Sequence, residues 1–182
     1  GNLPGSGAFN LTMGKAWSAE LELVGAGGEP VDLWRTLTSH GVADLAPNSL
    51  DEESRTLVTT LPLPRGRART ITIGPGRPGF ARVTGENVGA RDAVVLADAV
   101  RHMLRLDADL SGFYEVARAD TELGWAAAGA GRMLRSPTVF EDAIKTICTT
   151  NCAWGATVRM AGALVSNLGI EAPGGGRTFP TP

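Results

Sequence analysis

The sequence predicts an α+β fold, in which a small antiparallel β-sheet domain with one short helix precedes the start of an all-α helical core. Two observations support this prediction. Before residue 90, apolar and polar residues alternate in several short runs, as in strands with one buried face. After residue 90, apolar residues recur three and four positions apart, as on one side of a helix. We therefore expect a flexible segment over residues 1–7, a sheet domain over 8–90 and helices over 91–182.

The sheet domain is expected to contain five strands and one short helix. Thr70-Ile71-Thr72-Ile73 is β-branched throughout and gives the clearest strand signal. Turns are expected at Arg65-Gly66 and at Gly74-Pro75-Gly76. The helix is expected over residues 32–38, and a Pro- and Asp-rich loop over residues 47–53. The expected strands are residues 8–13, 19–24, 54–61, 68–73 and 80–84.

The first helix after the sheet domain is expected to run from an Asp92 N-cap to Leu104. Two shorter helical segments follow, one containing Phe113 and Tyr114 and one over residues 120–125. The residues that we expect on the buried side of the first helix are Val94, Ala97, Val100, Met103 and Leu104.

The clearest helix is expected over residues 137–151, because Pro137 suits a first helical position and Thr138-x-x-Glu141 resembles a capping box. A last helix is expected over residues 153–168, ending at Gly169. The expected buried residues of these two helices are Phe140, Ile144, Ile147, Cys148, Trp154, Val158, Ala161, Leu164, Val165 and Leu168.

Composition is that of an ordinary globular protein, since 43% of residues are hydrophobic and 20% are charged. No run approaches the length of a membrane span, so no membrane partner is expected and a cytoplasmic location is favoured, associated with the nucleoid in a prokaryote. Cys148 and Cys152 are expected to be free thiols in a reducing compartment, because a disulfide within one helical turn is strained. Neither a metal site nor a cofactor site is predicted.

The formal net charge of −2 does not by itself suggest a nucleic-acid-binding protein. Residues 65–91 nevertheless contain six arginines against Glu86 alone. This stretch is interpreted either as a solvated arginine-rich hairpin or as a surface that contacts phosphates. The two histidines, His40 and His102, lie far apart in sequence and do not indicate a catalytic triad.

A resemblance to a known family comes from one continuous segment. Leu134-Arg135, residues 137–141 and Ile147-Cys148-Thr149-Thr150-Asn151 occur in order, followed by Met160 and Leu164. This pattern resembles the start of the helical core in the helix-hairpin-helix DNA glycosylases, in particular the 8-oxoguanine and 3-methyladenine II enzymes. The family's order of sheet domain, linking helix and helical core is also the order that periodicity predicts here.

The resemblance implies base-excision repair, in which a damaged base is rotated out of double-stranded DNA and its N-glycosidic bond is cleaved. It implies that Asn151 fills the gap left in the duplex, with Arg135 and Arg159 as further DNA contacts. It also places Ser39-His40-Gly41 near the extruded base. Ala156 stands where the 8-oxoguanine enzymes have an arginine that contacts the orphaned base, and Arg159 lies one helical turn away.

The catalytic Asp and Lys of the family would follow Pro182, so no catalytic residue is assigned and the chain alone is expected to excise nothing. Self-association through the apolar helical face is expected, because that face is larger than a monomer usually exposes. Two other interpretations of the chain stay open. One is a non-catalytic nucleic-acid-binding module, and the other is an α+β domain that binds a small ligand or a protein.

Overall fold

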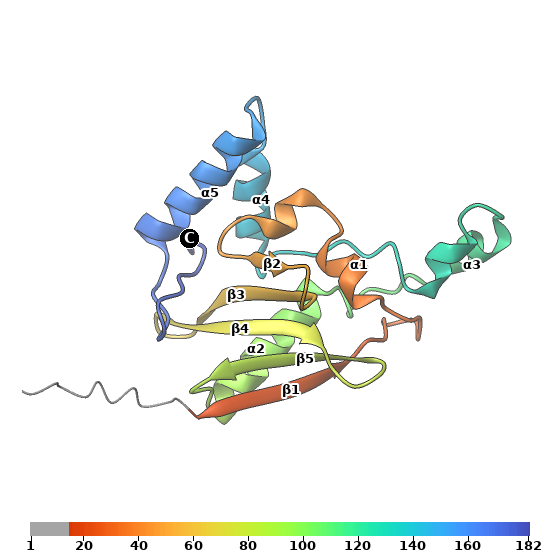
Figure 1. Cartoon of the computed structure of the whole chain (residues 1–182), viewed down its shortest axis with the longest axis horizontal. Coiled ribbons are helices and arrows are strands. Elements are labelled where there is room, and N and C mark those ends of the chain that lie inside the picture. The colour runs from red at the N-terminus through yellow and green to blue at the C-terminus, as the bar shows by residue number, and fades with distance from the viewer. Residues whose placement is uncertain (1–14) are drawn as a thin grey trace, which may run out of the picture.

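The computed structural model describes residues 15–182 and confirms the α+β fold (Figure 1). The expected segment 1–7 and the expected strand 8–13 lie outside the described residues. All neighbouring strands of the five-stranded sheet are antiparallel, in the order β1-β5-β4-β3-β2. The strands are β1 (Ala16–Glu22), β2 (Ser49–Asp51), β3 (Thr56–Leu63), β4 (Arg67–Pro75) and β5 (Phe80–Glu86).

Two expectations about the sheet were wrong in detail. The loop expected over residues 47–53 contains β2, which pairs with β3 because the Asp51 carboxylate accepts the N–H groups of Glu53 and Ser54 and so forms a tight turn. The turn expected at residues 74–76 lies later, because β4 continues in register with β5 through Pro75. Gly79, with a φ of +81°, then provides the left-handed backbone that this turn requires.

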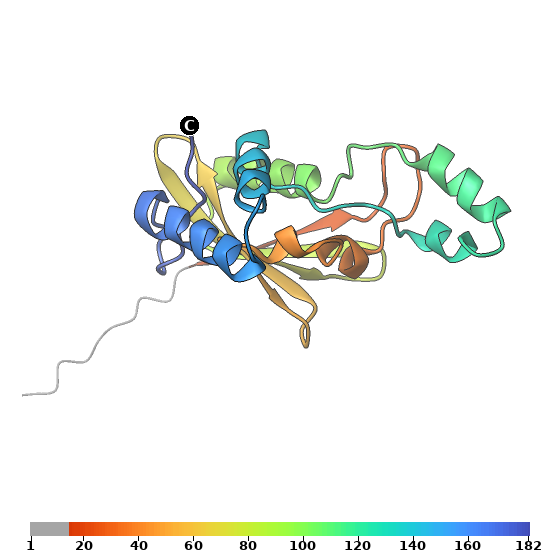
Figure 2. The same ribbon diagram turned by 90° about the horizontal axis from the view of Figure 1, so that it is seen from above.

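The main core lies between the sheet and α2 (Ala90–Met103), which runs along one face of the sheet (Figure 2). Gly89, and not Asp92, is the N-cap of α2, since the Asp92 carboxylate is engaged by Arg67. The expected buried side of α2 was also partly wrong, because Val94 is 61% exposed whereas Leu96 is buried. The fully buried members of this core include Leu57, Leu61, Ile71, Ile73, Val83, Leu96, Val100 and Met103.

The short helix α1 (Leu33–Leu37) forms as expected, with the Asp32 side chain accepting the backbone N–H of Arg35. A 3-10 helix, η1 (Gly41–Asp44), follows it. Two further short helices, α3 (Ser111–Ala119) and η2 (Gly124–Ala128), form a lobe at the end of the molecule opposite α4 and α5 in both views (Figures 1 and 2).

Helix α4 (Val139–Cys148) starts at a Thr138 N-cap whose hydroxyl accepts the N–H of Glu141. It ends three residues earlier than expected, because Asn151 adopts a left-handed backbone with a φ of +53°. Helix α5 (Trp154–Leu168) ends at Gly169 as expected. None of the helices in residues 15–182 combines the length and hydropathy needed to cross a membrane.

The expected buried stripes of α4 and α5 were largely wrong. The buried residues of α4 are Glu141 and Lys145, whose charged atoms lie 2.7 Å apart, and Lys145 Nζ also donates to the Leu45 carbonyl. The buried residues of α5 are Thr157 and Ala161. The apolar side chains that should have been buried are instead exposed by about half or more: Ile147, Trp154, Val158 and Leu168.

Candidate functional site

The α4–α5 turn holds Asn151 at its tip, with an exposed side chain. The two threonine hydroxyls of the turn are bonded to backbone carbonyls of α4. The hydroxyls of Thr149 and Thr150 donate to the carbonyls of Thr146 and Ile147, at 2.6 and 2.7 Å. Asn151 makes no side-chain hydrogen bond with any residue in the range 15–182, so its amide is free to contact a partner.

Both cysteines lie beside this turn and are free thiols. The Cys152 thiol donates to the Cys148 carbonyl over 3.1 Å, and the Thr157 hydroxyl donates to the same carbonyl over 2.8 Å. These contacts join the last turn of α4 to the first turn of α5. The backbone around Asn151 is therefore fixed by local hydrogen bonds rather than by contacts of Asn151 itself.

The segment Ser39-His40-Gly41 contacts the entry to the helical core. The Ser39 hydroxyl accepts the N–H of Leu134 at 2.9 Å, and His40 Nε2 donates to the Leu134 carbonyl at 2.8 Å. Gly41 lies against the exposed ring of Trp154, since a Cβ at Gly41 would be 3.5 Å from Trp154 Cη2. The structure thus brings a turn of the sheet domain next to the start of α5, three residues beyond Asn151.

The two arginines expected to contact DNA lie in different surroundings. Arg159 is exposed on α5, and its Nη1 atom folds back to within 3.5 Å of the position that a Cβ on Gly155 would occupy. Arg135 Nη1 instead pairs with the Asp107 carboxylate at 3.3 Å. Only Arg159 therefore shares the first turns of α5 with the tip at Asn151.

Four of the six arginines in the stretch are paired with carboxylates, and they share two of them, Asp92 and Glu20. Arg67 and Arg69 lie 2.7 and 4.0 Å from Asp92, and the hydrogen bonds with Arg67 lower the pKa of the Asp92 carboxyl. Arg77 and Arg82 lie 2.8 and 3.5 Å from Glu20. This pairing favours the interpretation of a solvated hairpin over that of a phosphate-binding surface.

Two cavities flank the candidate residues. Ser39 lines a cleft of about 580 Å³ together with Arg35, Trp125 and Met133. The sequence did not predict that Arg35 and Trp125 line one cleft, because residues ninety positions apart carry no joint signal. The second cavity, of about 480 Å³, is an almost wholly apolar groove between α4 and α5, lined by Cys148, Met160, Ala163, Leu164, Asn167 and Leu168.

Within residues 15–182, no three His, Cys, Asp or Glu side chains are grouped as metal ligands. No protein-family model and no curated protein sequence matches the chain significantly. The functional interpretation therefore depends on the residues of the chain and on their arrangement.

Proposed function

We propose that the chain is part of a helix-hairpin-helix DNA glycosylase, which extrudes a damaged base from duplex DNA and cleaves its N-glycosidic bond. The α4–α5 turn is the observation that carries this proposal. A free amide stands at its tip, between two helices whose sequence resembles the start of the glycosylase core. The catalytic Asp and Lys that the resemblance implies are not among the matched residues, so the proposal assigns lesion recognition to this chain.

The chemistry of the tip suits a gap in a base stack. Extrusion of a base leaves its former partner with unpaired donors and acceptors, and a carboxamide can satisfy both kinds of group. Asn is also one of the few residues that tolerates the left-handed backbone found at position 151. The hydroxyls of Thr149 and Thr150 are already bonded to backbone carbonyls, whereas the amide of Asn151 is left to contact a partner.

Affinity for DNA is expected to be modest, because most of the arginines in residues 65–91 are already paired with carboxylates. Arg159 would provide a phosphate contact near the tip, so binding should weaken as salt rises. The proposal also places the protein inside the cell, where the free thiols of Cys148 and Cys152 would stay reduced.

The test is fluorescence anisotropy of the chain with two labelled duplexes, one intact and one carrying an abasic-site analogue. We expect tighter binding to the abasic duplex. Asn151→Gly keeps the left-handed backbone and removes the amide, so it should weaken binding to the abasic duplex by about tenfold, as for the loss of one hydrogen-bonding side chain. Intact duplex should be bound almost as before.

Asn167→Ala is the matched control, because Asn167 is an exposed asparagine near the far end of α5 whose amide donates to the Ala163 carbonyl. It should leave both affinities unchanged. Equal binding of the two duplexes by the unaltered chain, or equal losses in the two variants, would contradict the proposed function.

A further inference from the structure

The cleft beside Ser39 has features of a ligand site, and of its lining residues only Ser39 belongs to the segment that the resemblance places near the extruded base. Its volume of about 580 Å³ lies in the range of small-molecule sites. One wall comes from α1 and the residues just after it, which contribute Arg35 and Ser39. The other wall is η2, which contributes Trp125, and we call the segment from Ala130 to Met133 the floor.

Trp125 presents its ring to solvent instead of packing it in a core. Its exposed fraction is 59%, and the small core of the lobe consists of the alanines Ala117, Ala126 and Ala130. The Arg35 guanidinium carbon lies 4.7 Å from the centre of the Trp125 ring. The Trp125 indole is exposed and is oriented by the Arg35 guanidinium, so another planar group can stack on it.

Polar donors at the cleft lack acceptors. Arg35 Nε lies 3.4 Å from the Asp32 carboxylate, whereas its two terminal nitrogens make no hydrogen bond within the described residues. The Ser39 hydroxyl oxygen accepts from Leu134, and its own hydrogen has no acceptor among the residues of the range 15–182. A guanidinium can stack through its face and still donate hydrogen bonds in its plane to an anion.

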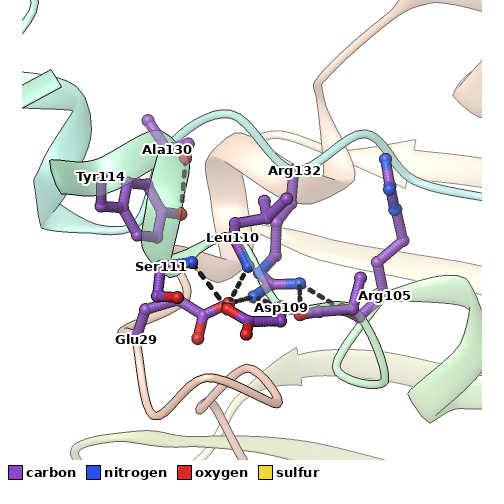
Figure 3. A network of polar contacts seen from close by, with 9 residues as sticks. Glu29, Arg105, Asp109, Leu110, Ser111, Tyr114, Ala130 and Arg132 are labelled. Atoms are coloured by element: carbon purple, nitrogen blue, oxygen red, sulfur yellow. Dashed lines mark hydrogen bonds and ion pairs between the residues drawn. The ribbon is translucent and has the colours of Figure 1, made fainter. Parts of the chain in front are cut away.

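Two residues of the floor, Ala130 and Arg132, belong to a buried polar network (Figure 3). The Tyr114 hydroxyl donates to the Ala130 carbonyl over 2.7 Å. The Arg132 guanidinium is fully buried, pairs with the Glu29 carboxylate and donates to the carbonyls of Arg105 and Ala108. Such support lowers the entropic cost of ligand binding, because the floor is already ordered.

One further bond fixes the two walls relative to each other. The Gly129 carbonyl, at the end of η2, accepts the N–H of Asp32, the N-cap of α1, at 3.0 Å. A Cβ at Gly129 would lie 2.6 Å from that Asp32 nitrogen, so this approach requires glycine. Arg35 and Trp125 are thus held facing each other by the backbone as well as by their own contact.

We propose that this cleft binds a nucleotide. The planar base extends the stack of Arg35 and Trp125, and the phosphate accepts hydrogen bonds from the Arg35 terminal nitrogens and the Ser39 hydroxyl. Asp32 offsets part of the positive charge of Arg35, so we expect the affinity for the nucleotide to be weak. The nucleotide is either free or part of a single strand, and both sources offer the same base and phosphate.

Isothermal titration of the full chain tests the proposal with four probes: adenosine monophosphate, adenosine, inorganic phosphate and a short single-stranded oligodeoxyadenylate. The monophosphate should bind more tightly than either of its parts. Trp125→Leu should weaken binding of the monophosphate by about tenfold, as for the loss of one stacked base, whereas Trp125→Phe should retain most of it. Arg35→Met should remove the preference for the monophosphate over adenosine.

Matched controls come from the same lobe. Leu123→Ala removes an apolar side chain that is 46% exposed, and Arg118→Met removes an exposed guanidinium of α3, and neither residue lines the cleft. Both variants should bind as the unaltered chain does. Circular dichroism of every variant verifies that the fold is retained.

Tighter binding of the oligonucleotide than of the monophosphate indicates a strand as the source, and equal affinities indicate a free nucleotide. The proposal is overturned if the unaltered chain shows no saturable binding of any probe, or if a folded Trp125→Leu variant binds the monophosphate unchanged. Because these probes lack a duplex, either result is independent of the Asn151 experiment.

Discussion

The sheet domain and the α4–α5 pair bury opposite kinds of side chain. In the sheet domain, leucines and isoleucines such as Leu57 and Ile73 have no exposed surface. In α4 and α5 the buried side chains are mostly polar, as with Glu141, Lys145 and Thr157, while Leu168 is 64% exposed.

This difference shows what an amphipathic pattern can and cannot predict. An apolar stripe is buried only where another surface of matching shape meets it. The sheet provides such a surface for α2. Within residues 15–182, α4 docks instead through the contact of Lys145 with the Leu45 carbonyl and the Phe179 ring. The apolar sides of α4 and α5 are left lining a groove.

The largest expected effect comes from the buried network that joins the sheet domain to the lobe. Arg132→Met leaves the Glu29 carboxylate buried without its cation, and the free energy of unfolding should fall by about 3–5 kcal/mol. Arg135→Met removes an arginine from a partly exposed pair with Asp107 and should cost far less. Urea denaturation of both variants measures the difference, and similar losses would contradict this role of Arg132.

Matched leucine deletions compare the two regions directly. Leu61→Ala opens a cavity in the sheet core and should cost about 2–5 kcal/mol. Leu168→Ala removes an exposed side chain and should change stability by less than about 0.5 kcal/mol. Chemical denaturation measures both losses, and the dependence of the free energy of unfolding on denaturant concentration should be the same for all variants. A large loss of stability for Leu168→Ala would show that α5 packs its apolar side in solution.

The two regions should also respond to pH with opposite signs. Burial raises the pKa of Glu141 above its ordinary value of 4.5, although Lys145 opposes this shift. Its contribution to stability is therefore present below 4.5 and lost as pH rises through the raised pKa. Hydrogen bonds from Arg67 lower the pKa of Asp92 below 3.8, so that contribution is present above 3.8 and lost as pH falls through the lowered pKa.

Denaturation of Glu141→Gln and Asp92→Asn between about pH 3 and pH 7 measures how much each carboxyl contributes to the pH dependence of the free energy of unfolding. Relative to the unaltered chain, Glu141→Gln should flatten the decline of stability toward higher pH. Asp92→Asn should flatten the decline toward lower pH. The same change of slope in both variants would contradict the assigned pKa directions.

The smallest expected effect is on assembly. We propose that the exposed α4–α5 face drives weak self-association, which sedimentation velocity at rising concentration would detect. Leu168→Glu should lower the associated fraction. Val94→Glu is the control, since Val94 is 61% exposed on α2 and does not line the groove between α4 and α5. Association that persists in Leu168→Glu would locate the contact elsewhere.

Local sequence signals determined much of the fold. Alternation located β1, β3, β4 and β5, and the helix expected over residues 32–38 corresponds to α1. The start of α4 was expected at Pro137, whereas Thr138 is the N-cap and the helix begins at Val139. Such signals work because strand periodicity and capping depend on residues a few positions apart. Asn151 was named from the family resemblance and not from these signals, and the structure places it at an exposed tip.

The remaining features were decided by tertiary structure. The sequence carries no local trace of the Arg132–Glu29 pair, the contacts of Ser39 and His40 with Leu134, or the stacking of Arg35 on Trp125. It also does not show which side of α4 is buried. Periodicity depends on a helix alone, whereas docking depends on the shape and polarity of whatever surface meets that helix.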